Sequence, residues 1–387
     1  MEQPARIAFV CEGDAENDAF SGTAKYIVHH LRQLGHEVVP INSRVKHPWR
    51  AINAIRSFSP NRNRWRSRFR YGDAAFRCRS SLAQRALDRL HGQVDVVFQV
   101  GAIFEPPTTG GIPYVLYCDW NMALSIRLQS HPGLSSKDAG WINDKQRAIY
   151  AGAATIFTIC DRLRQSFIDD YLIAPEKVVR AYPGANVDAN SIPARPLERD
   201  RTNPPSILFI GKEFRRKGGD TLLEAFRLVR REMANARLVC VGVEDLEPNQ
   251  PGVESLGLLR KSNPSERDRL LRAFAEADVV CLPSRHDPFP NVVREAMVLS
   301  LPCVTTDIWA FPEMVVDGET GFTVPVDNPS LLASRLIQIL GDPNLARRMG
   351  DAARTRAEHL FTWRTCAQTI GDHLQMLLGG GSELRNH

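Results

Sequence analysis

The chain has 387 residues, 43% of them hydrophobic and 24% charged, which excludes a disordered or fibrous protein and predicts two domains. The formal net charge of +5 is unevenly spread, because residues 44–79 hold eleven Lys or Arg and a single acid, Asp73. This basic region therefore carries +10, and the remaining residues sum to −5. Such an asymmetry indicates an interaction site within the basic region.

The cysteines and the hydropathy pattern indicate a cytoplasmic protein. The eight cysteines stand singly and form no CxxC pair, which disfavours a zinc ribbon, a redox motif or a disulfide framework. No apolar run reaches the roughly 18–20 residues that a membrane span needs, and residues 1–10 lack the pattern of a signal peptide. We therefore expect a cytoplasmic location, with peripheral contact with the inner face of a membrane left open.

In the first half of the chain, short apolar runs alternate with amphipathic stretches. Helices are expected over residues 22–34 and 144–153. Strands are expected over residues 6–10, 37–41, 94–100, 113–118, 154–159 and 177–182. Many of these runs are β-branched and do not alternate with polar residues, which is typical of parallel strands buried on both faces.

The alternation restarts after residues 190–206, which hold four prolines and read as a linker. Strands are then expected over residues 206–210, 236–242, 278–283 and 302–306, and helices over 220–232, 264–275, 292–299 and most of 329–378. The pattern predicts an α/β protein with two facing, doubly wound Rossmann-like domains. Ligands in such sheets bind beyond the carboxyl ends of the strands.

The segment PSRHDPFPNVVREAM, residues 283–297, follows a predicted strand and leads into a helix. Asp287 and Glu295 can accept hydrogen bonds from the hydroxyl groups of one elongated ligand. The free N–H groups of Asn291, Val292 and Val293 at the start of the helix can bind a phosphate or sugar oxygen. The alternative is a surface Asp and an ordinary helix Glu.

Two further loops carry phosphate-binding features. In FIGKEFRRKGG, residues 209–219, Gly211 ends a strand, and four cations, Lys212 and Lys217 among them, precede a helix. Cations and helix N–H groups together make a pyrophosphate site, unless the loop is simply solvated. Ser21 and Gly22 open the first helix, but no GxGxxG occurs and no acid ends the second strand, which disfavours a dinucleotide dehydrogenase.

The order and spacing of these segments resemble the retaining GT-B glycosyltransferases of family 4. The resemblance rests on SG with GHEV after it, GKEFRRKGG, ADVVCLPS-x2-D-x7-E-AM and LPCVTTDIWAFPEMVVDGETGFTVPVDNP, and covers about Ala5 to Phe361. It implies an acceptor-binding domain over residues 1–188 and a nucleotide-sugar-binding domain over 206–361. It also implies that residues 362–387 form a helix on the first domain, followed by a frayed tail.

The resemblance also implies roles for individual residues. Asp287 would face the hydroxyls of the donor sugar as a catalytic residue, and Glu295 would bond the ribose of the nucleotide. Lys212 and Lys217 would hold the donor diphosphate. The implied donor contacts are Gly22, Gly211, Lys212, Lys217, Pro290, Asn291, Val292 and Glu295.

Three residues depart from the family pattern. Asp287 stands where Glu is usual, and Pro290 stands where Gly is usual, which removes one amide donor. Cys118 replaces the His of a His-Asp pair. Asp119 therefore either takes over part of the acceptor-side catalytic role or is structural.

The implied reaction moves a sugar, of the hexosyl type, from a nucleotide-diphosphate sugar to a glycan, a lipid-linked or a small-molecule acceptor, with retention of configuration. No D-x-D triplet occurs, so no metal and no cofactor beyond the co-substrate are expected. The alternatives are a sugar-nucleotide 2-epimerase and a non-catalytic module that binds a sugar nucleotide or a partner.

Aromatic residues interleave with the arginines of the basic region, residues 44–79. Three interpretations remain open. The region can lie on an anionic membrane surface, which suits a lipid-linked acceptor. It can bind an anionic glycan or a phosphorylated acceptor directly, or it can be a solvated helical hairpin with its aromatic residues packed inward. No nucleic-acid-binding motif accompanies it, so nucleic acid is not an expected partner.

Overall fold

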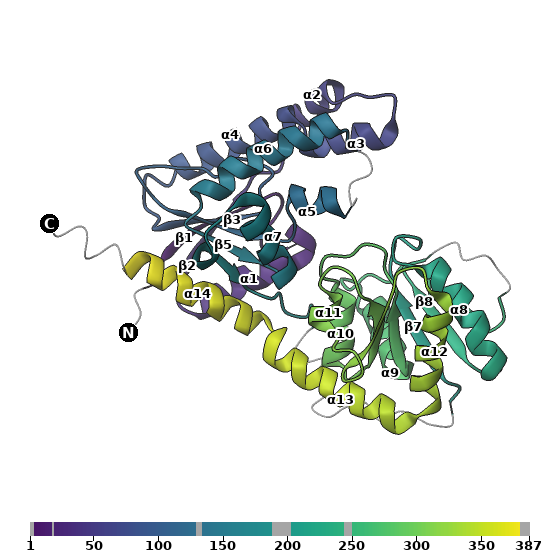
Figure 1. The fold of residues 1–387 in the computed structure, drawn as a ribbon. Helices are drawn as coiled ribbons and strands as arrows, with labels where there is room; N and C mark the ends of the chain where they lie inside the picture. Colours follow the sequence, from purple (N-terminus) through teal and green to yellow (C-terminus); the bar gives the residue numbers. More distant parts are fainter. Residues whose placement is uncertain (1–3, 18, 129–133, 188–202, 244–249, 380–387) are drawn as a thin grey trace. The chain divides into compact units, whose positions relative to one another are not determined.

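The structure is a computed structural model that describes residues 4–17, 19–128, 134–187, 203–243 and 250–379 (Figure 1). The chain divides into two compact units, Met1–Gly184 with Trp363–His387, and Ala185–Thr362. Most of the predicted linker, residues 190–206, lies outside the described residues.

The first unit is built on a parallel six-stranded sheet in the order β2-β1-β3-β4-β5-β6. Its strands are β1 (Arg6–Cys11), β2 (Glu37–Asn42), β3 (Val96–Val100), β4 (Tyr114–Cys118), β5 (Thr155–Thr158) and β6 (Val178–Arg180). Its α-helices are α1 (Thr23–Gln33), α2 (Trp49–Arg56), α3 (Arg62–Tyr71), α4 (Asp73–Asp88), α5 (Met122–Arg127), α6 (Ser136–Gly152), α7 (Asp161–Tyr171) and α14 (Trp363–Gly379), with 3-10 turns at Ala19–Gly22 and Pro175–Lys177.

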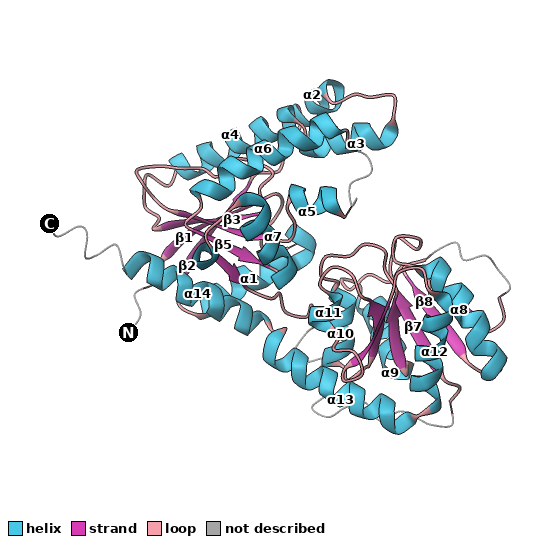
Figure 2. Ribbon diagram, viewed as in Figure 1, coloured by secondary structure: helices cyan, strands magenta, loops and turns pink. Residues whose placement is uncertain are grey.

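The second unit holds another parallel six-stranded sheet, in the order β12-β11-β10-β7-β8-β9. Its strands are β7 (Ser206–Ile210), β8 (Arg237–Val241), β9 (Val253–Ser255), β10 (Val279–Leu282), β11 (Cys303–Thr306) and β12 (Gly321–Val324). Its helices are α8 (Gly219–Glu232), α9 (Pro264–Glu276), α10 (Asn291–Val298), α11 (Phe311–Met314), α12 (Pro329–Gly341) and α13 (Pro343–Leu360). Figure 2 shows helices packed around the strands of each sheet.

The predicted α/β fold with two Rossmann-like sheets is confirmed. The strands could be predicted from their apolar runs because they are buried. In the first unit Phe9 on β1 stacks on Phe98 of β3 at 5.0 Å, and Phe98 stacks on Phe157 of β5 at 6.2 Å. All three rings are fully buried, as expected where helices cover a parallel sheet. Strands β9 and β12 were not predicted, because β9 is largely exposed and β12 directly follows the turn-forming residues DGET.

The last helix, α14, belongs to the first unit, where it packs against α1. Trp363 at its start stacks on Tyr26 of α1, with ring centroids 5.1 Å apart and planes nearly parallel. Further along, Gly371 faces α1, and an added Cβ there would lie 3.2 Å from Leu34 Cδ1. The two helices therefore approach closely along one face, with the aromatic pair at one end of the contact.

Candidate active site

The two acids of the 283–297 segment are buried at the carboxyl end of β10. Asp287 lies in the loop between β10 and α10 and is 8% exposed, and Glu295 lies inside α10 and is 4% exposed. Neither is a surface side chain. Burying two carboxylates is costly unless each has a partner that compensates its charge.

Each acid is paired with a lysine. Lys217, from the loop before α8, donates through Nζ to Asp287 Oδ2. Lys261, from the loop before α9, donates through Nζ to Glu295 Oε1. The structure thus brings Lys217 and Asp287, two of the predicted site residues, into direct contact. Lys261 was missed, since it lies 34 residues from Glu295 and carries no motif of its own.

Glycines bring the basic loop of residues 211–219 against the acidic loop. An added Cβ on Gly211 would lie 2.9 Å from Lys217 Cγ. Gly218 has φ +73°, and a Cβ there would lie 1.9 Å from the carbonyl oxygen of Pro283, which no side chain tolerates. Lys212 is exposed and, within the described residues, has no ion pair, so its charge is available to a ligand.

The amino end of α10 lies beside the acidic loop. Pro290 is the N-cap residue and makes no side-chain capping bond. Asn291 is half-buried, its Oδ1 accepts a hydrogen bond from Arg294, and Val292 is buried. The first amides of a helix have no partner within it, and the helix dipole adds positive potential there, so this end suits a phosphate.

His286, immediately before Asp287, was not singled out from the sequence. Its ring packs on Trp309 with centroids 4.7 Å apart, and both ring nitrogens are buried without a hydrogen-bond partner in the described part of the chain. Burial lowers the pKa of His286, so the ring is neutral near pH 7. A neutral imidazole can donate one hydrogen bond and accept another, and here neither capacity is used.

Asp119 and Gly22 belong to the first unit, whereas the other eight predicted site residues belong to the second. Gly22 is the N-cap residue of α1 and has φ +85°, a conformation that favours glycine. Asp119 follows β4, and its Oδ1 is buried without a hydrogen-bond partner among the described residues. Burial raises the pKa of Asp119 to about 6, although the charge of Arg70 opposes the rise.

Cys118 precedes Asp119 at the end of β4 and is fully buried. Burial raises the pKa of its thiol, as does the neighbouring Asp119 carboxylate, so the thiol stays protonated and unreactive. Of the two residues at this strand end, only Asp119 has the chemistry of a base.

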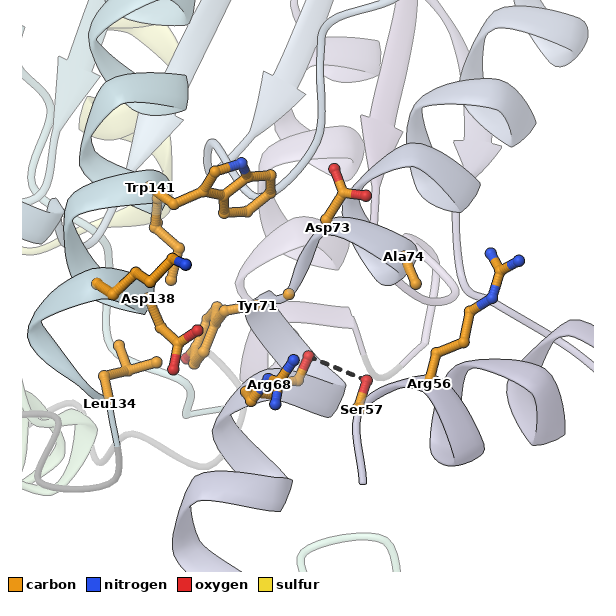
Figure 3. Close-up of a pocket in the computed structure, with 12 residues that line it drawn as sticks. Arg56, Ser57, Arg68, Tyr71, Asp73, Ala74, Leu134, Asp138 and Trp141 are labelled. Carbon is orange, nitrogen blue, oxygen red and sulfur yellow. Dashed lines mark hydrogen bonds between the residues drawn. The ribbon is translucent and has the colours of Figure 1, made fainter. Parts of the chain in front are cut away.

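The first unit also holds a pocket of about 470 Å³ between α3, α4 and α6 (Figure 3). Tyr71 and Trp141 line it, together with Arg68, Asp73 and Asp138. The Ser57 hydroxyl donates to the carbonyl oxygen of Arg68 at 3.4 Å, which ties the end of α2 to α3 at its edge. The pocket therefore lies between helices of the basic region and α6, which is outside that region.

Only some aromatic residues of the basic region pack inward. Phe76 is buried, and Trp65 donates through Nε1 to the carbonyl oxygen of Ala54 at 3.0 Å. In contrast, Trp49 is 57% exposed and Phe58 is 66% exposed. The region is helical, as one of the three interpretations expects, but its packing does not account for the exposed rings.

Two family models match the chain in consecutive segments. Residues 22–189 match "Glycosyltransferase Family 4", and residues 194–356 match "Glycosyl transferases group 1". A glycogen synthase of Mycobacterium tuberculosis is 31% identical over 44% of this chain and 42% of its own. The chain spans about half the length of the curated relatives it matches, or somewhat less.

Solved structures show the fold. A sucrose-phosphate synthase from Thermosynechococcus elongatus superposes with a TM-score of 0.69 at 17% identity, covering 97% of this chain and all of the other. The Anabaena protein HepE, solved in complex with UDP-glucose, superposes with a TM-score of 0.61 at 14% identity, covering 96% of this chain and all of the other. At such identities the likeness extends to the fold alone.

Proposed function

The chain belongs to family 4 of the GT-B glycosyltransferases, and from this we propose that it transfers a sugar from a nucleotide-diphosphate sugar to an acceptor hydroxyl with retention of configuration. The observation that carries the proposal is the pair of buried acids, Asp287 and Glu295, each joined to a lysine at the amino end of α10. HepE, a protein of the same fold, was solved with UDP-glucose, which supports a nucleotide sugar as the donor.

The charges of this site suit a diphosphate donor. Two carboxylates alone would repel a diphosphate, but Lys217 and Lys261 neutralise them. Lys212 and the first amides of α10 then supply a net positive potential. In this arrangement Glu295 bonds the ribose, Asp287 bonds hydroxyls of the transferred sugar, and the amides beside Asn291 hold a phosphate oxygen.

The proposed reaction breaks the bond between the anomeric carbon and the diphosphate oxygen. A bond from the acceptor oxygen to the same carbon forms on the same face, and no protein nucleophile is needed. Lys212, Lys217 and the helix amides stabilise the charge that develops on the leaving diphosphate. We propose that these groups do so without a metal or a further cofactor.

The acceptor proton needs a destination, which is the departing phosphate or a base on the acceptor side. Asp119 has the chemistry of such a base, because Oδ1 has no hydrogen-bond partner in the described residues and the pKa of about 6 leaves it ionised but basic at neutral pH. We propose that Asp119 takes this role where the family usually has a histidine one position earlier.

The acceptor is proposed to be anionic or lipid-linked, with the enzyme working in the cytoplasm at the inner face of the membrane. Within the described part of the chain, no helix is long and apolar enough to cross a bilayer. However, Trp49, Ile52, Ile55 and Phe58 are exposed on α2 and the turn after it, next to the arginines of α3. Apolar side chains beside cations are typical of helices that lie in a membrane interface.

Incubation of the purified protein with labelled UDP-, GDP- and ADP-sugars tests the proposal. We expect hydrolysis or transfer with one donor. Isomerised sugar would instead indicate a 2-epimerase, and binding without turnover a non-catalytic module. Glu295→Ala should abolish donor binding, whereas Glu319→Ala, at an exposed position of the same unit, should preserve it. Unchanged affinity in Glu295→Ala would contradict the assigned site.

A further inference from the structure

A second pocket of the first unit, of about 320 Å³, is lined mainly by arginines. We name it the arginine pocket. Its charged lining residues are Glu12, Arg44, Arg50, Arg66, Arg70 and Arg79. Five cations thus surround one carboxylate.

The single acid of the arginine pocket is already neutralised. Arg79 is only 4% exposed and donates to Glu12 Oε1 from NH2 at 2.7 Å and from Nε at 2.9 Å. Its NH1 donates to the carbonyl oxygen of Arg70 at 2.8 Å, which ties α4 to the end of α3. Among the described lining residues, Arg50 and Arg66 therefore have no compensating acid.

A buried side chain holds together the two helices that carry Arg50 and Arg66. Asn53, buried on α2, donates through Nδ2 to the carbonyl oxygen of Phe69 on α3 at 2.8 Å. Arg50 on α2 and Arg66 on α3 face the pocket, and among the described residues neither makes an ion pair or a side-chain hydrogen bond. Like charges placed close together repel one another, so an anion that bridged the two guanidinium groups would stabilise this arrangement.

The arginine pocket lies where an α/β sheet binds ligands. Glu12 directly follows β1, and Arg44 follows β2 by one residue, so the pocket opens at the carboxyl edge of the sheet. Asp119 follows β4 at the same edge, two strands along from β1 in the sheet order. At about 4.8 Å between strands, that is roughly 10 Å from strand β1 to strand β4.

We infer that the arginine pocket binds a phosphate monoester carried by the acceptor, and that Arg50 and Arg66 bridge its oxygens. Guanidinium groups match phosphate oxygens with paired hydrogen bonds, and a dianion neutralises more of the excess charge than a carboxylate does. The role as acceptor rests on the proposed function, although binding of the phosphate does not. The ester belongs either to a soluble phosphorylated compound or to a lipid headgroup.

Titration of the purified full chain with glycerol 3-phosphate, and with phosphatidylcholine vesicles with and without phosphatidic acid, tests this inference at low ionic strength. The test variant is Arg50→Gln with Arg66→Gln. The matched control is Arg62→Gln with Arg89→Gln, which removes two exposed arginines from the same unit outside the pocket. Thermal unfolding of both variants checks that they fold.

We expect the test variant to bind at least about tenfold more weakly than the wild type, and the control to bind as the wild type does. Loss of glycerol 3-phosphate binding supports a soluble ligand, and loss confined to phosphatidic acid vesicles supports a lipid headgroup. Equal losses of binding in the test and control variants would indicate diffuse electrostatic attraction and would overturn the inference. Wild-type binding in both variants would overturn it as well. Donor hydrolysis by the wild type is measured alongside, and its absence contradicts the proposed function without altering the binding result.

Discussion

At the scale of single residues, the most unusual group is the Asp119 carboxyl. Its Oδ1 is buried without a partner in the described residues, and burial raises its pKa to about 6. Buried acids of this kind are costly to stability and occur mainly where chemistry needs them. This favours the catalytic over the structural interpretation of Asp119.

The raised pKa predicts an acid limb in the rate profile. As a base, Asp119 must be ionised, so kcat/KM should fall towards tenfold per pH unit below about pH 6. Asp119→Asn should lower the rate and remove this limb. Asp169→Asn, at an exposed position, should keep the wild-type rate and the acid limb. An unchanged acid limb in Asp119→Asn would show that another residue is the base.

Lys217 and Lys212, both proposed to hold the donor diphosphate, should differ in their effect on stability. Lys217→Met leaves the Asp287 carboxylate buried without its cation, which should cost about 3 kcal/mol of unfolding free energy as well as donor affinity. Lys212→Met removes an exposed charge, so it should weaken donor binding and change stability by less than about 0.5 kcal/mol. Denaturant unfolding and donor titration measure the two effects. Equal stability of the two variants would argue against the buried ion pair.

At the scale of elements, a close backbone contact at Gly218 holds the basic loop against the acidic loop. Gly218→Ala combines a positive φ with a clash against the carbonyl oxygen of Pro283, so we expect a loss of about 3 kcal/mol or more, together with loss of donor binding. Gly257 has φ +65° and nothing within 4 Å of an added Cβ. Gly257→Ala should therefore cost only about 1–2 kcal/mol, measured by the same denaturant unfolding.

The elements that could be predicted from the sequence are those with a clear pattern of burial. Strands such as β1 and β10 are buried on both faces and stand out as apolar runs, and the helices beside them have an amphipathic period. Asp287, Glu295, Lys212 and Lys217 could be proposed as site residues because they lie in two short segments of the sequence. Lys261 and His286 could not be proposed from the sequence. Lys261 meets Glu295 only in the tertiary fold, and the lack of partners for the His286 ring nitrogens is evident only from their burial in the structure.

At the scale of the whole molecule, the net charge of +5 conceals a basic region whose structure is now clear. The region forms α2, α3 and the first turns of α4, which enclose the arginine pocket and present exposed apolar side chains. Its arginines and its apolar side chains have separate proposed partners, a phosphate ester and a bilayer. The sequence alone could not separate the two sets of side chains, because it does not show which of them are exposed.

The exposed apolar side chains predict vesicle binding. Trp49→Ser with Ile55→Ser should weaken association with anionic vesicles by about tenfold or more, because both side chains would enter the interface. Leu172→Ser with Met376→Ser removes two equally exposed apolar side chains from the same unit and should leave association unchanged. Sedimentation with vesicles measures both variants, and equal losses would contradict a membrane face on α2.

The central claim is retaining transfer from a nucleotide-diphosphate sugar, and proton NMR of the sugar first released tests it most directly. With α-linked UDP-, GDP- and ADP-sugars supplied in turn, we expect one donor to be consumed and the α-anomer to appear first, before mutarotation. Release of the β-anomer, or no consumption of any donor, would contradict it.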